Sequence, residues 1–542
     1  MSRYTLFHNL IDIHNQTIYP AAITVDGRSV VSIEPTENKC LNYILPGFID
    51  SHIHIESSML IPSEFARMAV KHGTVATISD PHEIANVCGV EGVEFMLANA
   101  KKVPFKFHFG APSCVPATPF ETAGASLGTN ETEHLLQRDD IYFLSEMMNY
   151  PAVLNDEQEV LQKIKLARVL KKPVDGHAPG LRGQYAKKYI QAGISTDHEC
   201  YTKEEALEKI GFGMKILIRE GSAARNFEAL IDLLNDFEDE IMFCCDDKHP
   251  DELLLHHINL HVKRALDKGI DLFKVLKAAC LNPVIHYKID VGLLRVNDKA
   301  DFIVIDNLSD FNILQTVIDG EEVYGNEKIL IQPVKEGEIN KFACSLKQID
   351  DFRVRHEGNR IKVIEALDGQ LTTGTIMMDP LVKAGWVDAD ISRDILKIVV
   401  VNRYADEPVA KAFIRNFGLQ KGAIASTVAH DSHNIVCVGT DDASICGAVN
   451  ALIEIKGGIV VFDPNEKHVM RLPVGGLMSN RRAEDVAAMY SLMDKKAKAL
   501  GSKLSAPFMT LSFMALLVIP QLKLSDKGLF DGQKFTFTSL FD

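Results

Sequence analysis

Two histidines separated by one residue, His52 and His54, end a short apolar run in the segment PGFIDSHIHIESS. In an extended chain, residues two apart point to the same side, so both imidazoles can reach one point. Two imidazoles that converge in this way can ligate one metal ion. Alone, the pair could equally lie on a solvated strand face. Its place at the end of a predicted buried strand favours the metal site.

Four further side chains of the ligand type each follow a later apolar run. They are Glu146 after YFLS, His177 after PVDG, His198 after STD and Asp246 after FCC. Each of them alone is more simply a structural residue, because a carboxylate after a strand often caps a helix. That structural interpretation applies most strongly to Asp197 and Asp247. Five coincidences at strand ends, the histidine pair included, predict that these side chains share one site.

The elements that would position these residues are short apolar runs that alternate with segments of helical period. Eight runs can be counted, at 43–49, 74–78, 105–110, 141–145, 173–175, 194–196, 214–218 and 241–245. The third is the weakest, because it carries Lys106 and His108. Strand–helix alternation repeated eight times predicts an α/β fold, the TIM-like (β/α)8 barrel, whose functional residues gather at the C-terminal ends of the strands.

The segments on either side of the predicted barrel, which would span 43–285, have other patterns. Residues 1–42 and 286–340 alternate short strand-type runs with Asp, Asn and Gly turns, which predicts one β-sandwich built from both flanks of the barrel. Residues 341–542 mix strand and helix signals without a repeat. They predict an additional C-terminal α+β domain that covers the barrel or packs on it.

Bulk composition argues against several classes of protein. The 542 residues carry a formal charge of −15, which disfavours a nucleic-acid partner because phosphate binding needs a basic face. The longest apolar stretch, 507–520, is shorter than the roughly 18 residues of a spanning helix, so no membrane partner is expected. The N-terminus has no signal-peptide pattern, and the ten cysteines form no C-x-x-C pair. We therefore expect reduced thiols and a cytoplasmic protein.

Several motifs together resemble the amidohydrolase superfamily and, within it, the adenine deaminase branch. They are PGFIDSHIHIES, SDPHEIAN, DGHAPG, STDHE, CCDDKHPDEL and GLLRVNDKADFIVID, with ASTVAHDSHNIVCVGTDD and LPVGGLMS in the C-terminal region. The resemblance therefore covers nearly the whole chain. It implies a binuclear centre at the barrel mouth, in which His52, His54 and Asp246 hold one ion, His177 and His198 hold the other, and Glu146 bridges them.

The resemblance also bears on the metal and on the branch of the superfamily. Many superfamily members bridge their ions with a carboxylated lysine, and Glu146 in its place favours the deaminase branch. The implied ions are Mn²⁺ or Fe²⁺, and a ligand set of histidines and carboxylates does not exclude Zn²⁺. The mononuclear zinc design of other base deaminases needs C-x-x-C, which this sequence lacks.

The activity that the resemblance implies is hydrolytic deamination of adenine to hypoxanthine and ammonia, with adenine and water as the only small-molecule partners. Asp246 would accept a proton from the attacking hydroxide, and His82 and Glu83 would act on the ring nitrogens. Glu83 has an equal claim as a helix cap. A related amidohydrolase acting on another aminated heterocycle or cyclic amide would show the same ligands. A scaffold that has lost its metals is disfavoured, because all six expected ligands are present.

Residues outside the expected ligand set carry further expectations. Glu56, Asn86 and Asp247 are expected to line the substrate pocket, and for Asp247 an indirect role behind the ligands is equally open. His430, Asp431 and His433 are expected in a polar loop folded over the barrel mouth, since no partner for another metal site is identifiable. Gly475 and Gly476 suit a close approach of the backbone. We expect a homodimer.

Overall fold

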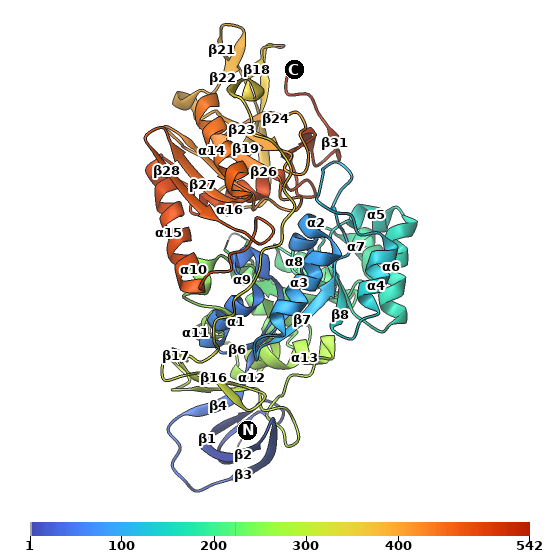
Figure 1. Cartoon of the computed structure of the whole chain (residues 1–542). Helices are drawn as coiled ribbons and strands as arrows, with labels where there is room; N and C mark the ends of the chain where they lie inside the picture. The colour runs from blue at the N-terminus through green and yellow to red at the C-terminus, as the bar shows by residue number, and fades with distance from the viewer. Residues whose placement is uncertain (1–2, 223) are drawn as a thin grey trace.

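The computed structural model describes residues 3–222 and 224–542 and has three tiers, an outer sheet, a barrel and a C-terminal sheet (Figure 1). The barrel strands are β5 (Phe48–His54), β6 (Thr74–Ser79), β7 (Lys106–Ala111), β8 (Ile141–Met147), β9 (Val174–Gly176), β10 (Thr196–Asp197), β11 (Lys215–Arg219) and β12 (Ile241–Cys244). Neighbours pair in parallel within two groups, β5 to β9 and β10 to β12, and β13 (Asp246–Asp247) returns to pair with β5. The predicted (β/α)8 barrel is confirmed, its weak third strand included.

The first predicted barrel run, 43–49, is divided between two sheets. Its first part is β4 (Tyr43–Pro46), which pairs with strands of the outer sheet, and only the residues from Phe48 onward enter the barrel. Gly47 lies at the crossing, where a Cβ atom would come 2.2 Å from Cγ1 of Val75. A glycine lets the chain pass this close to β6, which the apolar pattern could not indicate.

Helices cover the outside of the barrel between successive strands. They are α1 (Pro62–Lys71), α2 (His82–Cys88), α3 (Val90–Ala100), α4 (Thr129–Leu136), α5 (Tyr150–Leu154), α6 (Gln158–Val169), α7 (Gly183–Gln191), α8 (Lys203–Gly211), α9 (Phe227–Leu230), α10 (Pro250–Leu253), α11 (Ile258–Asp267), α12 (Leu272–Leu276) and α13 (Asn282–Tyr287). In α6 the buried Val160, Ile164 and Ala167 recur at helical spacing. This stripe forms the face that packs on the barrel.

The outer sheet joins the two flanks of the barrel. Its strand order is β17 (Lys328–Ile329), β16 (Glu321–Gly325), β15 (Ile313–Ile318), β14 (Phe302–Ile305), β4, β1 (Tyr4–Asp12), β2 (Thr17–Asp26) and β3 (Ser29–Pro35). Side chains from both flanks, among them Ile23 and Phe302, share one hydrophobic cluster. The N-terminal segment and the segment after the barrel thus join in one eight-stranded sheet, and the β-sandwich expected from both flanks stays a prediction.

The C-terminal region is built on an eight-stranded sheet. Its order is β20 (Thr373–Met378), β19 (Ile361–Ala366), β24 (Ala410–Arg415), β23 (Leu396–Val401), β26 (Ile435–Gly439), β25 (Ala423–Ser426), β27 (Gly458–Asp463) and β28 (Glu466–Arg471). Helix α14 (Asp442–Ile455) packs on β25, β26 and β27, and α15 (Ala483–Ala499) on β27 and β28. Two small sheets complete the region, one of β18 (Val354–Arg355), β21 (Leu381–Lys383) and β22 (Trp386–Asp388), the other of β29 (Leu522–Ser525), β30 (Gly528–Asp531) and β31 (Thr536–Phe537).

The two faces of the C-terminal sheet belong to different hydrophobic clusters. In β23, Val399 and Val401 pack in the cluster that contains residues of α14, whereas Ile398 and Val400 join the large cluster that includes the barrel core. Alternation along the strand thus faces one side of the sheet toward the barrel. Gly475 lies so close to α2 that a Cβ atom would come 2.4 Å from Cδ1 of Ile84. The C-terminal region therefore packs directly on the barrel, in one continuous hydrophobic cluster.

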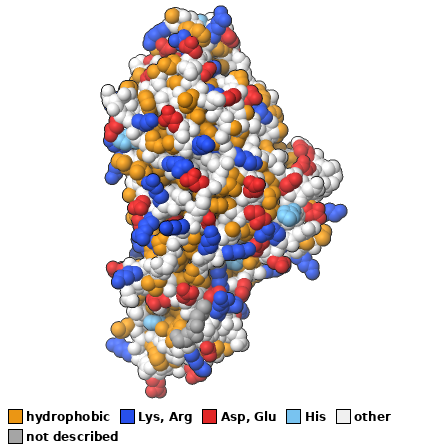
Figure 2. All heavy atoms as spheres, in the orientation of Figure 1, with side chains coloured by type: hydrophobic (Ala, Val, Ile, Leu, Met, Phe, Trp, Pro, Cys, Tyr) orange, Lys and Arg blue, Asp and Glu red, His pale blue; other side chains and the backbone are white. Residues whose placement is uncertain are grey.

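The apolar stretch 507–520 contributes to this cover. It forms α16 (Pro507–Ser512) and a short 3-10 turn, Phe513–Ala515, both buried. Within the described part of the chain, we find no helix with the length and apolar character needed to cross a membrane. On the face shown in Figure 2, acidic and basic side chains are interspersed, and no basic face is visible there.

Asp50 closes the barrel by connecting its first and last strands. Oδ1 of Asp50 accepts hydrogen bonds from the backbone N–H groups of His52 (3.3 Å) and Cys245 (3.1 Å), and its Oδ2 lies 2.8 Å from Nε2 of His257. All of these groups are buried. Breaking such a pair leaves an imidazole and two N–H groups without a partner.

We predict that Asp50→Ala lowers the free energy of unfolding by about 3 kcal/mol, whereas Asp50→Asn, which keeps one acceptor oxygen, has a smaller effect. The measurement is urea unfolding followed by circular dichroism at equal metal content. Equal midpoints for the two variants would show that Asp50 does not close the barrel.

Candidate active site

The first group of ligand-type atoms gathers at the end of β5. Nε2 of His52 lies 3.2 Å from Nε2 of His54, and Oδ1 of Asp246 lies 3.4 Å and 3.2 Å from these two nitrogens. Ligands placed tetrahedrally around an ion at 2.0–2.1 Å stand roughly 3.3 Å apart. The three atoms therefore have the spacing of ligands to one divalent ion. The expected same-side arrangement of His52 and His54 is observed.

Glu146, at the end of β8, connects this group to a second one. Its Oε2 lies 2.8 Å from Nδ1 of His177 and 3.3 Å from Nε2 of His198, while its Oε1 lies 3.2 Å from Nε2 of His54. One carboxylate thus offers one oxygen to each group. The predicted ligand-type residues all come together at the C-terminal ends of the strands, and their donor set of nitrogen and oxygen atoms suits two Mn²⁺, Fe²⁺ or Zn²⁺ ions.

Asp246 and Asp247 do not alternate as residues of a regular strand would. In a regular strand adjacent side chains point to opposite sides, yet Asp246 and Asp247 line the same cavity, the place expected for Asp247. The physical reason is the backbone of Asp246, whose φ of 60° lies in the left-handed region. Asp247 accepts a short hydrogen bond from Oγ of Ser57, so it is held beside the first ligand group.

A buried arginine that sequence reasoning missed lies behind the ligands. Arg219 is fully buried at the end of β11, and its Nη1 contacts Oε1 of Glu199 and lies 2.5 Å from Oδ2 of Asp246. Burial alone would raise the pKa of Asp246, but Arg219 and the nearby histidines hold it well below its usual range. Asp246 therefore keeps Oδ1 for the metal group and Oδ2 for Arg219. The same strand-end rule that predicted Asp246 could have found Arg219.

The N-terminus of α2 supplies a further polar wall. Oδ1 of Asp80 accepts a hydrogen bond from the backbone N–H of His82 (3.0 Å), and its Oδ2 lies 3.2 Å from Nδ1 of His82. The same Nδ1 lies 3.6 Å from Oε1 of Glu146, so His82 stands beside the metal group. Glu83 points elsewhere: its two carboxylate oxygens contact Nδ1 of His430 and Nε2 of His433. The partner that the sequence did not reveal for these two histidines is Glu83.

The C-terminal region closes the site. His430 and Asp431 line the cavity over the ligands, together with the apolar Leu371, Phe513 and Leu516. The free space above the ligands is only about 20 Å³. The expected polar loop over the barrel mouth is therefore present, and this cover excludes bulk water from the buried charges.

Two residues expected in the substrate pocket lie outside this cavity. Among the described residues, its lining does not include Glu56 or Asn86, although both are buried. Oε1 of Glu56 accepts a hydrogen bond from the N–H of Ile84 (3.1 Å), and Asn86 donates to the carbonyl of His82 (3.0 Å). Burial raises the pKa of Glu56 to about 7. In this arrangement both side chains fix α2, and their contact with a substrate stays a prediction.

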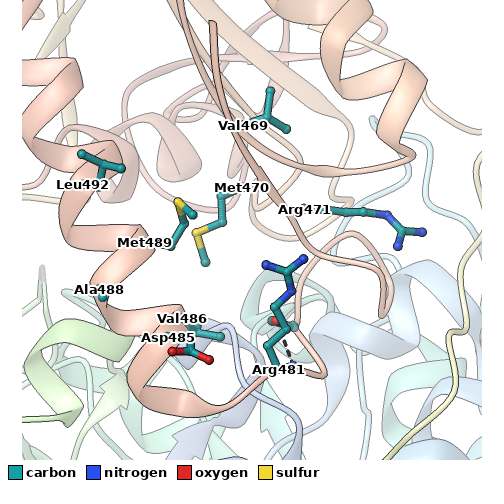
Figure 3. A pocket seen from close by; sticks show the side chains of 10 residues that line it. Val469, Met470, Arg471, Arg481, Asp485, Val486, Ala488, Met489 and Leu492 are labelled. Atoms are coloured by element: carbon teal, nitrogen blue, oxygen red, sulfur yellow. Dashed lines mark hydrogen bonds between the residues drawn. The ribbon is translucent and has the colours of Figure 1, made fainter.

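A larger hollow of about 440 Å³ lies between β28 and α15, away from the ligands (Figure 3). Met470, Met489 and Leu492 form its apolar side, and Arg481 extends across it. Its lining has one carboxylate, Asp485, and no histidine. The convergent polar groups that chemistry requires are therefore at the barrel mouth, in the smaller space.

The comparisons with known proteins agree with this architecture. The amidohydrolase family matches residues 43–323, which include the barrel and all six ligand-type residues. The chain therefore belongs to the amidohydrolase family.

A finer assignment follows from the C-terminal region and from relatives along the whole chain. The adenine deaminase C-terminal domain matches residues 370–536. Proteins named adenine deaminase from Sulfurovum sp. and Salinibacter ruber are 54% and 52% identical to this chain, covering 98% and 99% of it and the same shares of their own lengths. A third, from Borreliella burgdorferi, is 50% identical over 99% of this chain and 100% of its own length. Within the amidohydrolases, the chain belongs to the adenine deaminase family.

We predict that Arg219→Met lowers either the affinity for divalent ions or kcat by about 10–100-fold, because it leaves two buried carboxylates without their cation. Arg219→Lys keeps the positive charge but not the forked guanidinium geometry. Its metal affinity and kcat should lie between those of Arg219→Met and those of the wild type. Ion affinity is measured by titration of metal-free protein. A metal content and a kcat unchanged in Arg219→Met would contradict the positioning role.

Proposed function

We propose that this protein catalyses the hydrolytic deamination of adenine to hypoxanthine and ammonia at the barrel mouth. The observation that carries the proposal is the pair of ligand groups joined by Glu146, which lies in a chain about half identical to proteins named adenine deaminase. A site of this composition can prepare a water molecule for attack on the carbon that bears the exocyclic amine.

The proposed ligand assignment follows the distances. His52, His54 and Asp246 would hold one ion, His177 and His198 the other, and Glu146 would bridge them, with Mn²⁺ or Fe²⁺ as the proposed ions. When bound, the ions would lower the pKa of water so that a nucleophile exists near neutral pH. The contribution of this chain would be to hold that water between the barrel mouth and the C-terminal region, away from bulk solvent.

Asp246 is the proposed proton acceptor for the attacking water. Its Oδ1 lies beside Nε2 of His52 and of His54, where the first ion is proposed, and Arg219 keeps it ionised in spite of complete burial. It would take the proton from the attacking oxygen and pass it to the departing amine, so that ammonia leaves as a neutral molecule. His82, which stands 3.6 Å from Glu146, and Asp247 are proposed to bind the heterocycle beside this centre.

The experiment that tests the proposal is a substrate and metal screen. Protein freed of metal by chelation should release no ammonia, and two equivalents of Mn²⁺ or Fe²⁺ should restore release from adenine. Because the relatives of about half identity are named for adenine, the free base, adenine should react far faster than adenosine. Comparable kcat/KM values for adenine and adenosine would contradict the assignment to adenine. Ammonia release only from another aminated heterocycle, or hydrolysis of a cyclic amide, would move the assignment to that substrate. Full activity without metal would contradict the site.

A second prediction separates proton transfer from metal binding. Asp246→Asn keeps the shape and one oxygen ligand but removes the base, so kcat should fall by at least about 100-fold while most of the metal remains bound. His52→Ala and His54→Ala should lose metal and activity together. Asp247→Asn should act mainly on KM, because Asp247 lines the cavity but is not one of the proposed metal ligands. Metal analysis and initial rates on the same samples decide between these outcomes. A crippled kcat in Asp247→Asn with a nearly normal Asp246→Asn would transfer the role to Asp247.

A further inference from the structure

Glu83 and two histidines from the C-terminal region form a buried cluster beside the metal group. Nδ1 of His430 contacts Oε1 of Glu83, and Nε2 of His433 contacts Oε2. Glu83 is separated from His430 and His433 by 347 and 350 positions in the chain, and all three residues are buried. Each oxygen of Glu83 therefore has an imidazole partner, and Glu83 lines the same cavity as His430.

The hydrogen bonds of His433 fix its protonation state. The backbone N–H of Ala429 points at Nδ1 of His433 at 3.2 Å, and because an N–H can only donate, this Nδ1 must carry a lone pair. His433 is then neutral, with its proton on Nε2, which it donates to Glu83. Burial and the neighbouring His430 also lower the pKa of His433. Its function in the cluster is to orient the carboxylate.

His430 is arranged differently. Its Nδ1 is bound to Glu83, its ring stacks on Phe513 with centroids 4.5 Å apart, and its backbone N–H donates to the carbonyl of Ser512 (3.1 Å). His430 lines the cavity, whereas His433 does not. Since Nδ1 is held by the carboxylate, Nε2 is the ring nitrogen left to face a ligand.

We propose that His430 donates a proton from Nε2 to the purine ring nitrogen next to the reacting carbon, and that Glu83 acts through His430 as a positioning residue. This inference rests on the proposed deamination and deepens it. It makes the C-terminal region part of the catalytic machinery. A carboxylate that holds Nδ1–H fixes the orientation of the ring and stabilises its charged form.

The atoms of the step balance with adenine and water alone. The water oxygen forms a bond to the carbon that bears the amine, and the electron pair of the ring C=N bond moves to nitrogen, which takes the proton from His430. The C–NH2 bond then breaks as the carbonyl forms, and the proton that Asp246 accepted leaves with ammonia. The second proton of the water restores His430, and the proton that His430 gave remains on the ring of hypoxanthine.

The charges around His430 support this assignment. Burial opposes its charged form, but Glu83 and Asp247, with Asp431, outweigh burial and raise the pKa of His430 to about 9. The neighbouring His433 and His249 have lowered pKa values, so neither competes as a cation at neutral pH. His430 therefore carries its proton at neutral pH and loses it as the pH rises through about 9.

The central test compares two matched variants. His430→Gln removes the acid and should lower kcat by at least about 100-fold with the metal content unchanged. His433→Gln retains an N–H donor for Glu83 and should cost less than about tenfold. A purely structural cluster predicts similar losses in both variants. A kcat of His430→Gln within tenfold of the wild type, or a third equivalent of metal that His430→Gln loses, would overturn the proposal.

The pH profile of kcat/KM is a second test, because a purely structural role of Glu83 would not shift it. In the wild type, kcat/KM for adenine should fall as the pH rises above about 9, because the acid form of His430 is lost. Glu83→Gln removes the carboxylate that raises this pKa, so the alkaline limb should move to lower pH. An unmoved limb would contradict the action of Glu83 through His430.

An experiment that needs no substrate separates this proposal from the proposed function. NMR titration of the His430 ring in the protein loaded with diamagnetic Zn²⁺ should give a pKa well above the ordinary value, lowered in Glu83→Gln. An ordinary pKa for His430 would overturn the inference whatever the enzyme does with adenine. A raised pKa in a protein that releases no ammonia from adenine would instead contradict only the proposed function.

Discussion

The structure depends on the balance of charge in one buried space. Glu146, Glu199 and Asp246 lie within a few ångströms of one another and are nearly inaccessible to water. Buried carboxylates are costly unless cations or hydrogen bonds compensate them. Arg219 supplies one fixed cation, and the four histidines around Glu146 and Asp246 supply neutral or charged partners. Two divalent ions would complete this balance with the ligand geometry already present.

The rest of the architecture holds these residues together and excludes bulk water from them. The barrel brings together residues at the ends of β5, β8, β9, β10 and β11 and in β13, which are far apart in the chain. The C-terminal sheet turns one apolar face toward the barrel and presents His430, Asp431 and Phe513 over its mouth. With bulk water excluded, each charge acts more strongly on its neighbours than it would at a surface. The cover therefore contributes to the chemistry as well as to stability.

Much of this arrangement could be predicted from the sequence because it depends on local patterns. The eight apolar runs and the alternation within H-x-H specify which side chains meet at the barrel mouth, and the motifs specify the family. The backbone turn that brings Asp247 beside Asp246, and the partners of Glu83, could not be predicted in the same way. Asp247 depends on the left-handed backbone at Asp246, which no propensity for aspartate dictates. The link between Glu83 and His430 depends on how the C-terminal sheet docks, and one sequence contains no signal for a contact across 347 positions.

The most direct measurement of the central claim is a crystal structure of Mn²⁺-loaded protein with anomalous data collected at the manganese edge. The account predicts two peaks. One should lie about 2.0–2.2 Å from the ligand atoms of His52, His54 and Asp246, and the other about 2.0–2.2 Å from those of His177 and His198, with Glu146 in contact with both. A single peak would contradict the account. So would a peak located between Glu83, His430 and His433, because the ion would then replace the proton assigned to that cluster.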